Sequence, residues 1–112
     1  MFKHNEYTLS KILEYVIDSQ CEDDDFCIYG DDKIPLNLKN TYLVSDYPEV
    51  INGRDDYPYD VKEKKLNLVY YGEQFIDVIC SALEQKTSVS EQELVEALIF
   101  YYQNDNFITL KS

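Results

Sequence analysis

The sequence predicts an α+β domain in which a small, mainly antiparallel sheet of two to four short strands carries about three helices. Apolar residues recur at helical spacing near the start of the chain and twice near its end. Between these segments lie short β-branched and aromatic runs bounded by turn residues. The chain has 112 residues and no separate linker, so we expect a single domain over residues 1–112.

The first helix is predicted over residues 8–18. Thr8 can cap its first turn, and Tyr7 and Ile12 can pack together on either side of the cap. The apolar residues of this segment share one face, which we expect to join the core: Leu9, Ile12, Leu13, Val16 and Ile17.

Strands are predicted over residues 26–30 and 41–45, which read FCIYG and TYLVS. Between them, Pro35 argues against a central strand, so we expect a loop or an irregular edge. Residues 66–71, LNLVYY, form either a third strand or the lead into the next helix. We expect the helices to pack on one face of the resulting sheet.

Two further helices are predicted over residues 73–85 and from Ser90 to near Asn104. Ser90 and Glu93 can form a capping box, in which each side chain accepts a hydrogen bond from the other residue's backbone N–H. Three apolar side chains after this helix are expected to pack back against the core: Phe107, Ile108 and Leu110.

Residues 46–65 have the least regular pattern, and we expect a long surface loop there. Asn52-Gly53 is a turn signal within it. Its tyrosines, Tyr47, Tyr57 and Tyr59, lie among carboxylates. Long loops in compact domains are often functional, and the alternative is that these tyrosines fold back onto the core.

Acidic charge dominates the sequence, since 22 acids against 10 bases give a net charge of −12. The densest acidic stretch is Cys21–Asp32, CEDDDFCIYGDD, with six carboxylates and no base on the two sides of a predicted strand. Such a field repels phosphate, which excludes direct binding to nucleic acid or to an anionic membrane. It attracts basic surfaces, although acidity can also serve solubility alone.

The chain has no apolar run near the length of a membrane span, and its first ten residues are too polar for a signal peptide. The three cysteines lie at spacings that match no familiar metal or redox motif, so we expect free thiols. Both observations favour a protein of the cytoplasm.

Few residues could support catalysis or hold a metal ion. The only histidine, His4, lies near a terminus that we expect to be frayed and solvated, which argues against a Ser-His-Asp or Cys-His arrangement. A calcium loop starting at Asp23 fails because Ile28 stands where glycine is required. We therefore expect no enzyme activity, no cofactor and no metal site.

A protein-binding surface fits the composition better. The chain has 11 tyrosines and no tryptophan, and tyrosine is favoured as an interface anchor within a polar or charged rim. In this interpretation the carboxylates meet Lys or Arg of a basic partner, and the tyrosines fill its pockets. The predicted partner-binding residues are Asp23, Asp24, Asp25, Asp31, Asp32, Asp55, Asp56, Tyr57 and Tyr59.

The size, the acidity, the lack of catalytic groups and the α+β order resemble those of small cytoplasmic immunity proteins that protect bacteria from their own toxins, including those of contact-dependent growth inhibition. The segment Ala97-Leu98-x-x-Tyr101-Tyr102-x-x-Asp105-x-Phe107-Ile108 also resembles the end of a small bacterial family suspected of that role. The resemblance implies a cognate toxin domain as partner, such as a basic nuclease blocked at its active site or substrate path. It transfers no contact residues.

Two other functions remain open from the sequence. An acidic mimic of nucleic acid could inhibit a DNA-binding or restriction protein, but the charge is concentrated at residues 21–32 and cancels over residues 33–65. A small enzyme or metal protein is the third possibility, and no motif supports it.

Overall fold

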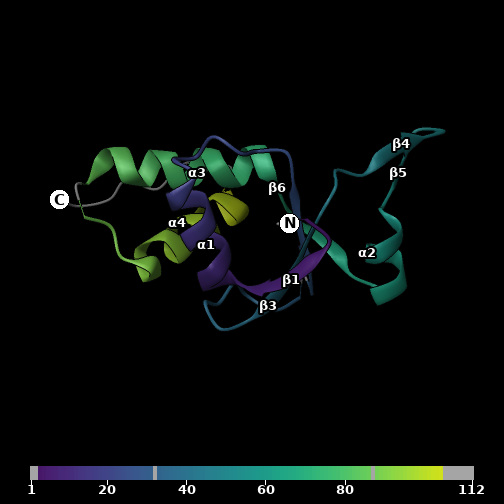
Figure 1. Ribbon diagram of the computed structural model, residues 1–112, viewed down its shortest axis with the longest axis horizontal. Coiled ribbons are helices and arrows are strands. Elements are labelled where there is room, and N and C mark those ends of the chain that lie inside the picture. The colour runs from purple at the N-terminus through teal and green to yellow at the C-terminus, as the bar shows by residue number, and fades with distance from the viewer. Residues whose placement is uncertain (1–2, 32, 87, 105–112) are drawn as a thin grey trace.

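Four strands form an antiparallel sheet in the computed structural model, which describes residues 3–31, 33–86 and 88–104 (Figure 1). They are β1 (Asn5–Thr8), β2 (Cys27–Gly30), β3 (Thr41–Ser45) and β6 (Asn67–Tyr71). The order across the sheet is β1–β3–β2–β6, and each neighbouring pair is antiparallel. The α+β prediction is confirmed, and of the two interpretations of residues 66–71 the strand is correct.

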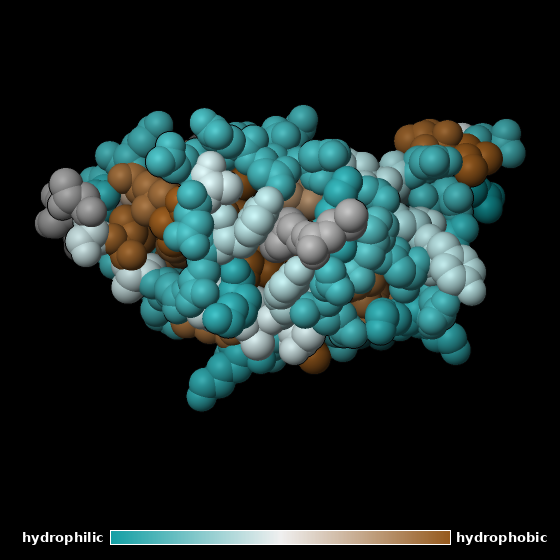
Figure 2. All heavy atoms as spheres, in the orientation of Figure 1, coloured by the Kyte–Doolittle hydropathy of each residue, from teal (hydrophilic) through white to brown (hydrophobic). Residues whose placement is uncertain are grey.

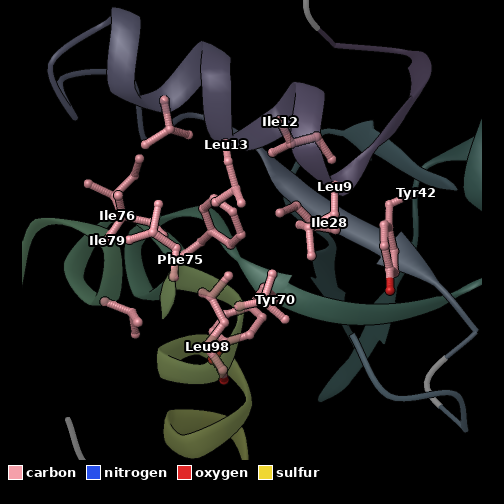
Figure 3. Close-up of a cluster of buried hydrophobic side chains, with 14 of the residues drawn as sticks. Leu9, Ile12, Leu13, Ile28, Tyr42, Tyr70, Phe75, Ile76, Ile79 and Leu98 are labelled. Carbon is pink, nitrogen blue, oxygen red and sulfur yellow. The ribbon is translucent and has the colours of Figure 1, made fainter. Parts of the chain in front are cut away.

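Three helices cover one face of this sheet, and their positions confirm the three predicted helices: α1 (Leu9–Asp18), α3 (Gly72–Gln85) and α4 (Glu91–Asn104). They bury a large apolar cluster together with Ile28 and Tyr70 of the sheet (Figure 3). Phe75 of α3 is fully buried within it, and its ring centroid lies 6.3 Å from that of Phe26 and 5.8 Å from that of Tyr70.

A fourth, shorter helix, α2 (Tyr59–Lys64), covers the opposite face of the sheet. Its Val61 is buried in a second cluster with Cys27 and Tyr29, whereas Ile28 between them belongs to the first cluster. Successive strand residues point to opposite faces, so an apolar run such as β2 requires cover on both. The expected packing of the helices on one face is therefore correct for α1, α3 and α4, whereas α2, which was not predicted, lies on the other face.

Two short strands form a separate hairpin: β4 (Glu49–Ile51) and β5 (Arg54–Asp56). Asn52 and Gly53 connect them with φ values of 53° and 77°, the left-handed conformation that such two-residue turns require. The hairpin projects from the end of the molecule opposite the three-helix cluster (Figure 1). The prediction of an irregular loop over residues 46–65 is thus wrong, because this stretch forms the hairpin and α2. The predicted turn at Asn52-Gly53 is confirmed.

No sequence signal predicts β1, because its side chains are exposed or half-buried and show no apolar alternation. The strand forms through backbone pairing with β3, in the register Asn5↔Val44 to Thr8↔Thr41. The pairing extends one residue further, since the N–H of His4 donates to the carbonyl of Val44 at 2.6 Å. The expectation of a frayed terminus is wrong from residue 3 onward.

The predicted helix caps are confirmed. Thr8 Oγ1 accepts a hydrogen bond from the N–H of Lys11 at 3.3 Å. Ser90 and Glu93 exchange hydrogen bonds between side chain and backbone, both at 3.1 Å. The apolar side chains expected to pack back after α4 lie outside the described residues, which end at Asn104.

Candidate functional site

The acidic stretch at residues 21–32 is divided by β2. Asp23–Asp25 precede the strand and Asp31 follows it, so the strand, roughly 13 Å long, lies between the two groups. Asp31 accepts a hydrogen bond from the N–H of Lys33 at 3.0 Å, within a local turn. Asp32 lies outside the described residues. The described carboxylates of the stretch therefore lie at the two ends of β2.

The segment Asp23–Asp25 is held against the body of the protein. Tyr15 of α1 donates to the Asp23 carboxylate at 2.6 Å, and Asp23 also accepts the N–H of Asp25 at 3.1 Å. Tyr47 donates to the carbonyl of Asp24 at 3.0 Å. These contacts use Asp23 for local structure and leave the carboxylates of Asp24 and Asp25 exposed.

The segment before β2 lies in close backbone contact with the start of α3, because Gly72 at that position has no side chain. A Cβ atom on Gly72 would lie 2.0 Å from the carbonyl oxygen of Phe26 and 2.7 Å from that of Asp24. Only a residue without a side chain fits there. The same contact region includes Tyr47, whose hydroxyl accepts the N–H of Glu73 at 3.0 Å.

A cleft of about 540 Å³ opens between the N-terminal segment, the chain after β3, and α2. We call it the acidic cleft, and define it by its lining residues: His4, Asp46, Tyr47, Glu49, Asp56, Tyr57, Pro58, Tyr59, Asp60 and Lys62. Four of these are carboxylates, three are tyrosines and one is lysine. Such a combination of apolar rings with convergent charged groups is typical of a binding site.

The floor of the acidic cleft is a hydrogen-bond network around Asp60. Ser45, which is fully buried, donates to the two oxygens of Asp60 at 2.9 and 3.0 Å, and His4 Nδ1 lies 3.0 Å from Oδ2. Burial raises the pKa of Asp60, but hydrogen bonds from His4 and Ser45 outweigh it and leave the pKa below its ordinary value. Asp60 is therefore held as a carboxylate.

Asp46 connects this network to the acidic segment before β2. His4 Nε2 lies 3.4 Å from Asp46, and Lys3 Nζ lies 2.9 Å from Asp46 and 3.2 Å from Asp25. Tyr29 donates to the backbone carbonyl of Asp46 at 2.6 Å from inside the second cluster. The His4 side chain is about half exposed, as expected for a solvated residue, but it is not frayed, because pairing of β1 with β3 brings it between two carboxylates.

Ser45, His4 and Asp60 are the residue types of a nucleophilic triad, and they lie within 3.5 Å of one another although the position of His4 near the terminus argued against a Ser-His-Asp arrangement. Their arrangement differs from a triad in one respect. The Ser45 hydroxyl donates to Asp60, while His4 Nδ1 lies 3.5 Å from Ser45 and 3.0 Å from Asp60. A triad needs the histidine to accept the serine proton. In this geometry the Ser45 hydroxyl and the His4 ring both bind the Asp60 carboxylate, so the hydrogen bonds fix the positions of Asp60 and His4.

The tyrosines of the acidic cleft divide into two kinds. Tyr57 packs edge-on against Tyr29, with ring centroids 5.6 Å apart, and Tyr47 stacks on Tyr71 at 6.0 Å. Burial raises the pKa of Tyr47 above its ordinary value. Tyr59, by contrast, is 79% exposed at the start of α2. The fold-back alternative is therefore correct for two of the three tyrosines, and Tyr59 remains available to a partner.

Two lysines offset part of the negative charge of the acidic cleft. Lys62 forms an ion pair with Asp56, and Lys3 forms one with Asp46. No ion pair within the described part of the chain reaches Glu49, an exposed residue on the hairpin. The acidic cleft thus keeps a net negative charge with carboxylates near its opening.

The structure brings together only some of the predicted partner-binding residues. Asp56, Tyr57 and Tyr59 line the acidic cleft, and Asp25 borders it through Lys3. Asp55 lies on β5 of the hairpin, and Asp31 lies at the other end of β2.

Apart from Pro58 and Lys62, the cleft residues that the sequence-based prediction missed are His4, Asp46, Tyr47, Glu49 and Asp60. Four of them belong to the acid- and tyrosine-rich stretch 46–60, so its composition could have identified them. Only His4 carried no sequence signal, because its place depends on the unpredicted β1.

None of the helices in residues 3–31, 33–86 and 88–104 has the length and apolar character needed to cross a membrane. The same residues contain no cluster of three or more His, Cys, Asp or Glu side chains arranged to hold a metal ion.

Burial and a hydrogen bond to Cys80 raise the pKa of the Cys21 thiol to about 12, so its reactive thiolate form is disfavoured.

Comparisons with known proteins give one match. No curated protein and no solved structure is significantly similar to the chain. The model of one family, described as a domain of unknown function (DUF7716), matches residues 6–110. Because this match covers nearly the whole chain, the protein belongs to the DUF7716 family.

Proposed function

We propose that this protein is an immunity protein, which binds a cognate toxin domain and neutralises it. The acidic cleft is the observation that supports the proposal, because it places an exposed tyrosine, Tyr59, among four carboxylates. The partner is a basic protein, such as a nuclease with a positively charged substrate path. Binding of the acidic cleft to that path would occlude the active site.

The physical basis is a division of roles between charge and apolar contact. The net charge of −12 accelerates encounter with a basic surface and sets its orientation. Carboxylates near the opening, such as Glu49, pair with Lys or Arg of the partner. Tyr59 then becomes desolvated in the interface, where tyrosine is favoured as an anchor. Asp60, fixed by Ser45 and His4, offers a rigid acceptor that needs little reordering on binding.

The same proposal places the protein in the cytoplasm, where an immunity protein meets the incoming toxin, and assigns it no reaction and no cofactor. The partner would be the C-terminal domain of a secreted effector. Neither nucleic acid nor a membrane is proposed as a ligand, because the negative field opposes both.

The test looks for a secreted protein encoded beside this chain's gene and expresses the C-terminal domain of that protein, alone and with the chain. We expect growth arrest with the toxin domain alone and full growth when the wild-type chain is co-expressed. A cleft variant, Tyr59→Ala/Glu49→Gln, should protect at least about tenfold less well when toxin dose is varied. Failure of the wild-type chain to protect would refute the proposal.

A matched control changes the same residue types on the helical end, as Tyr102→Ala/Glu84→Gln. Tyr102 is 52% exposed on α4, and Glu84 is exposed on α3. Both variants are first shown to be folded by circular dichroism. Equal loss of protection in the two variants would mean that the acidic cleft has no special role.

A further inference from the structure

The β4–β5 hairpin carries an apolar surface that the core does not use. Val50 is 72% exposed and Ile51 is 49% exposed, although both are large aliphatic residues. Figure 2 shows this apolar patch at the projecting end of the molecule, surrounded by hydrophilic residues. An isolated two-stranded ribbon is only marginally stable in water, so its exposed aliphatic residues do little to stabilise the fold.

The register of the hairpin places apolar side chains on both of its faces. Val50 pairs with Asp55, and Ile51 pairs with Arg54. Paired residues share a face and successive residues alternate, so one face carries Val50 with a carboxylate and the other carries Ile51 with a guanidinium. A ribbon that docked flat on a partner would use one apolar face. A hairpin with an apolar residue on each face instead fits into a groove, where each face contacts one of the two opposite walls.

The charges around the hairpin indicate the charge that a complementary partner carries. Residues 46–60 contain five acids and one base, and Glu49 and Asp56 at the hairpin's base also line the acidic cleft. A second copy of this chain would bring two molecules of net charge −12 together, which disfavours self-association. A groove with a basic rim is complementary instead.

We propose that the β4–β5 hairpin enters a groove of a basic protein partner, with Val50 and Ile51 contacting opposite walls while the adjacent acidic cleft engages the basic rim. This inference rests on the proposed function and specifies how the partner is held. The apolar contacts govern how long the complex lasts, and the carboxylates govern how fast it forms.

The experiment incorporates a photo-crosslinking amino acid at position 50 of the full chain in the source cell. The same amino acid at position 34 serves as a matched control, since Ile34 is 52% exposed and lies beside Ile99 and Tyr102 of α4, away from the hairpin. We expect an adduct with a basic protein at position 50 and none with that protein at position 34. An adduct with another copy of this chain, an acidic partner, or no adduct at position 50 would overturn the inference.

The captured protein is then purified and its affinity measured for four forms of the chain: wild type, Val50→Ser/Ile51→Ser, Ile34→Ser, and the cleft variant Tyr59→Ala/Glu49→Gln. The hairpin variant should bind about tenfold or more weakly, mainly through faster dissociation, whereas Ile34→Ser should bind like wild type. Equal affinity of the hairpin variant and the wild type would overturn the inference, provided thermal unfolding confirms that both are folded.

The outcomes separate this inference from the proposed function. If the hairpin variant binds normally and the cleft variant does not, the hairpin proposal fails while a binding role for the acidic cleft stands. If the captured basic protein binds through the hairpin but does not harm cells when expressed, the immunity function fails and the hairpin proposal stands.

Discussion

The two ends of the molecule treat their apolar residues in opposite ways. At the helical end, α1, α3 and α4 bury most of theirs, with Phe75 and Leu98 at 0% exposure. Tyr102 is an exception, and so is Ile17, which was expected in the core but is 39% exposed. At the other end, the hairpin leaves Val50 and Ile51 exposed, and the start of α2 leaves Tyr59 exposed. Figure 2 shows an apolar patch at this projecting end. A chain of 112 residues can stabilise itself with one large core. This difference indicates that the stability of the fold depends mainly on the helical end. The exposed side chains of the hairpin end remain available for contact with another protein.

The largest expected effect is loss of a core ring at the helical end. Phe75→Ala should lower the free energy of unfolding by about 3–5 kcal/mol, because it removes contacts with Phe26 and Tyr70 and leaves a cavity. Tyr59→Ala at the other end should change it by less than about 0.5 kcal/mol. Urea unfolding of the two variants measures both values. Similar losses would contradict the division between the two ends.

The next effect concerns the close backbone contact at Gly72. Gly72→Ala should destabilise by about 1–3 kcal/mol, because the new Cβ would collide with backbone oxygens of Phe26 and Asp24. Gly53→Ala in the hairpin turn meets open space and should cost about 1 kcal/mol, from its positive φ alone. Thermal unfolding compares the two. A larger loss for Gly53→Ala would show that the hairpin, and not the contact at Gly72, supports the fold.

The third effect depends on pH. The pKa of Asp60 is lower in the folded protein than its ordinary value of 3.8, so its stabilising contribution is present above about pH 4 and is lost as pH falls through the folded pKa. Asp60→Asn should therefore cost about 1–2 kcal/mol at pH 7 and much less near about pH 2. Urea unfolding at both pH values measures the difference. A control, Asp77→Asn on the exposed side of α3, should cost little at either. A cost for Asp60→Asn that is independent of pH would contradict this account.

The smallest of these effects concerns the cap of α4. Ser90→Ala should destabilise by about 1 kcal/mol, because Glu93 loses the hydroxyl that accepts its N–H. Ser88→Ala, at an exposed position before the cap, should have almost no effect. Chemical unfolding at pH 7 distinguishes the two, and equal effects would mean that the capping box contributes nothing.

The helices could be predicted because their signals are local. Thr8, Ser90 and Glu93 mark helix starts within one turn of chain, and the apolar periodicity of α1 and α3 does not depend on other elements. Two of the elements that were not predicted, α2 and β1, have no such signal. α2 is six residues long and buries one apolar side chain, Val61, and β1 forms only because β3 lies beside it.

The candidate site could be predicted only in part, for a related reason. Composition identified Asp56, Tyr57 and Tyr59, which are close together in the chain. Composition also led to the prediction of Asp31 as a partner-binding residue, but Asp31 follows β2 and therefore lies at the other end of that strand. His4 reaches Asp60 across 56 positions, through strand pairing that no local pattern encodes.

The central claim is that the acidic cleft and hairpin bind a basic protein. Its most direct test is the association rate of the purified chain with the toxin domain against which it protects, measured at about 0.05 M and about 0.5 M salt. We expect the rate to fall by about tenfold or more at high salt, and the cleft variant Tyr59→Ala/Glu49→Gln to associate more slowly than the helical-end control Tyr102→Ala/Glu84→Gln at low salt. Rates that do not change with salt, and that are equal for the two variants, would contradict the account.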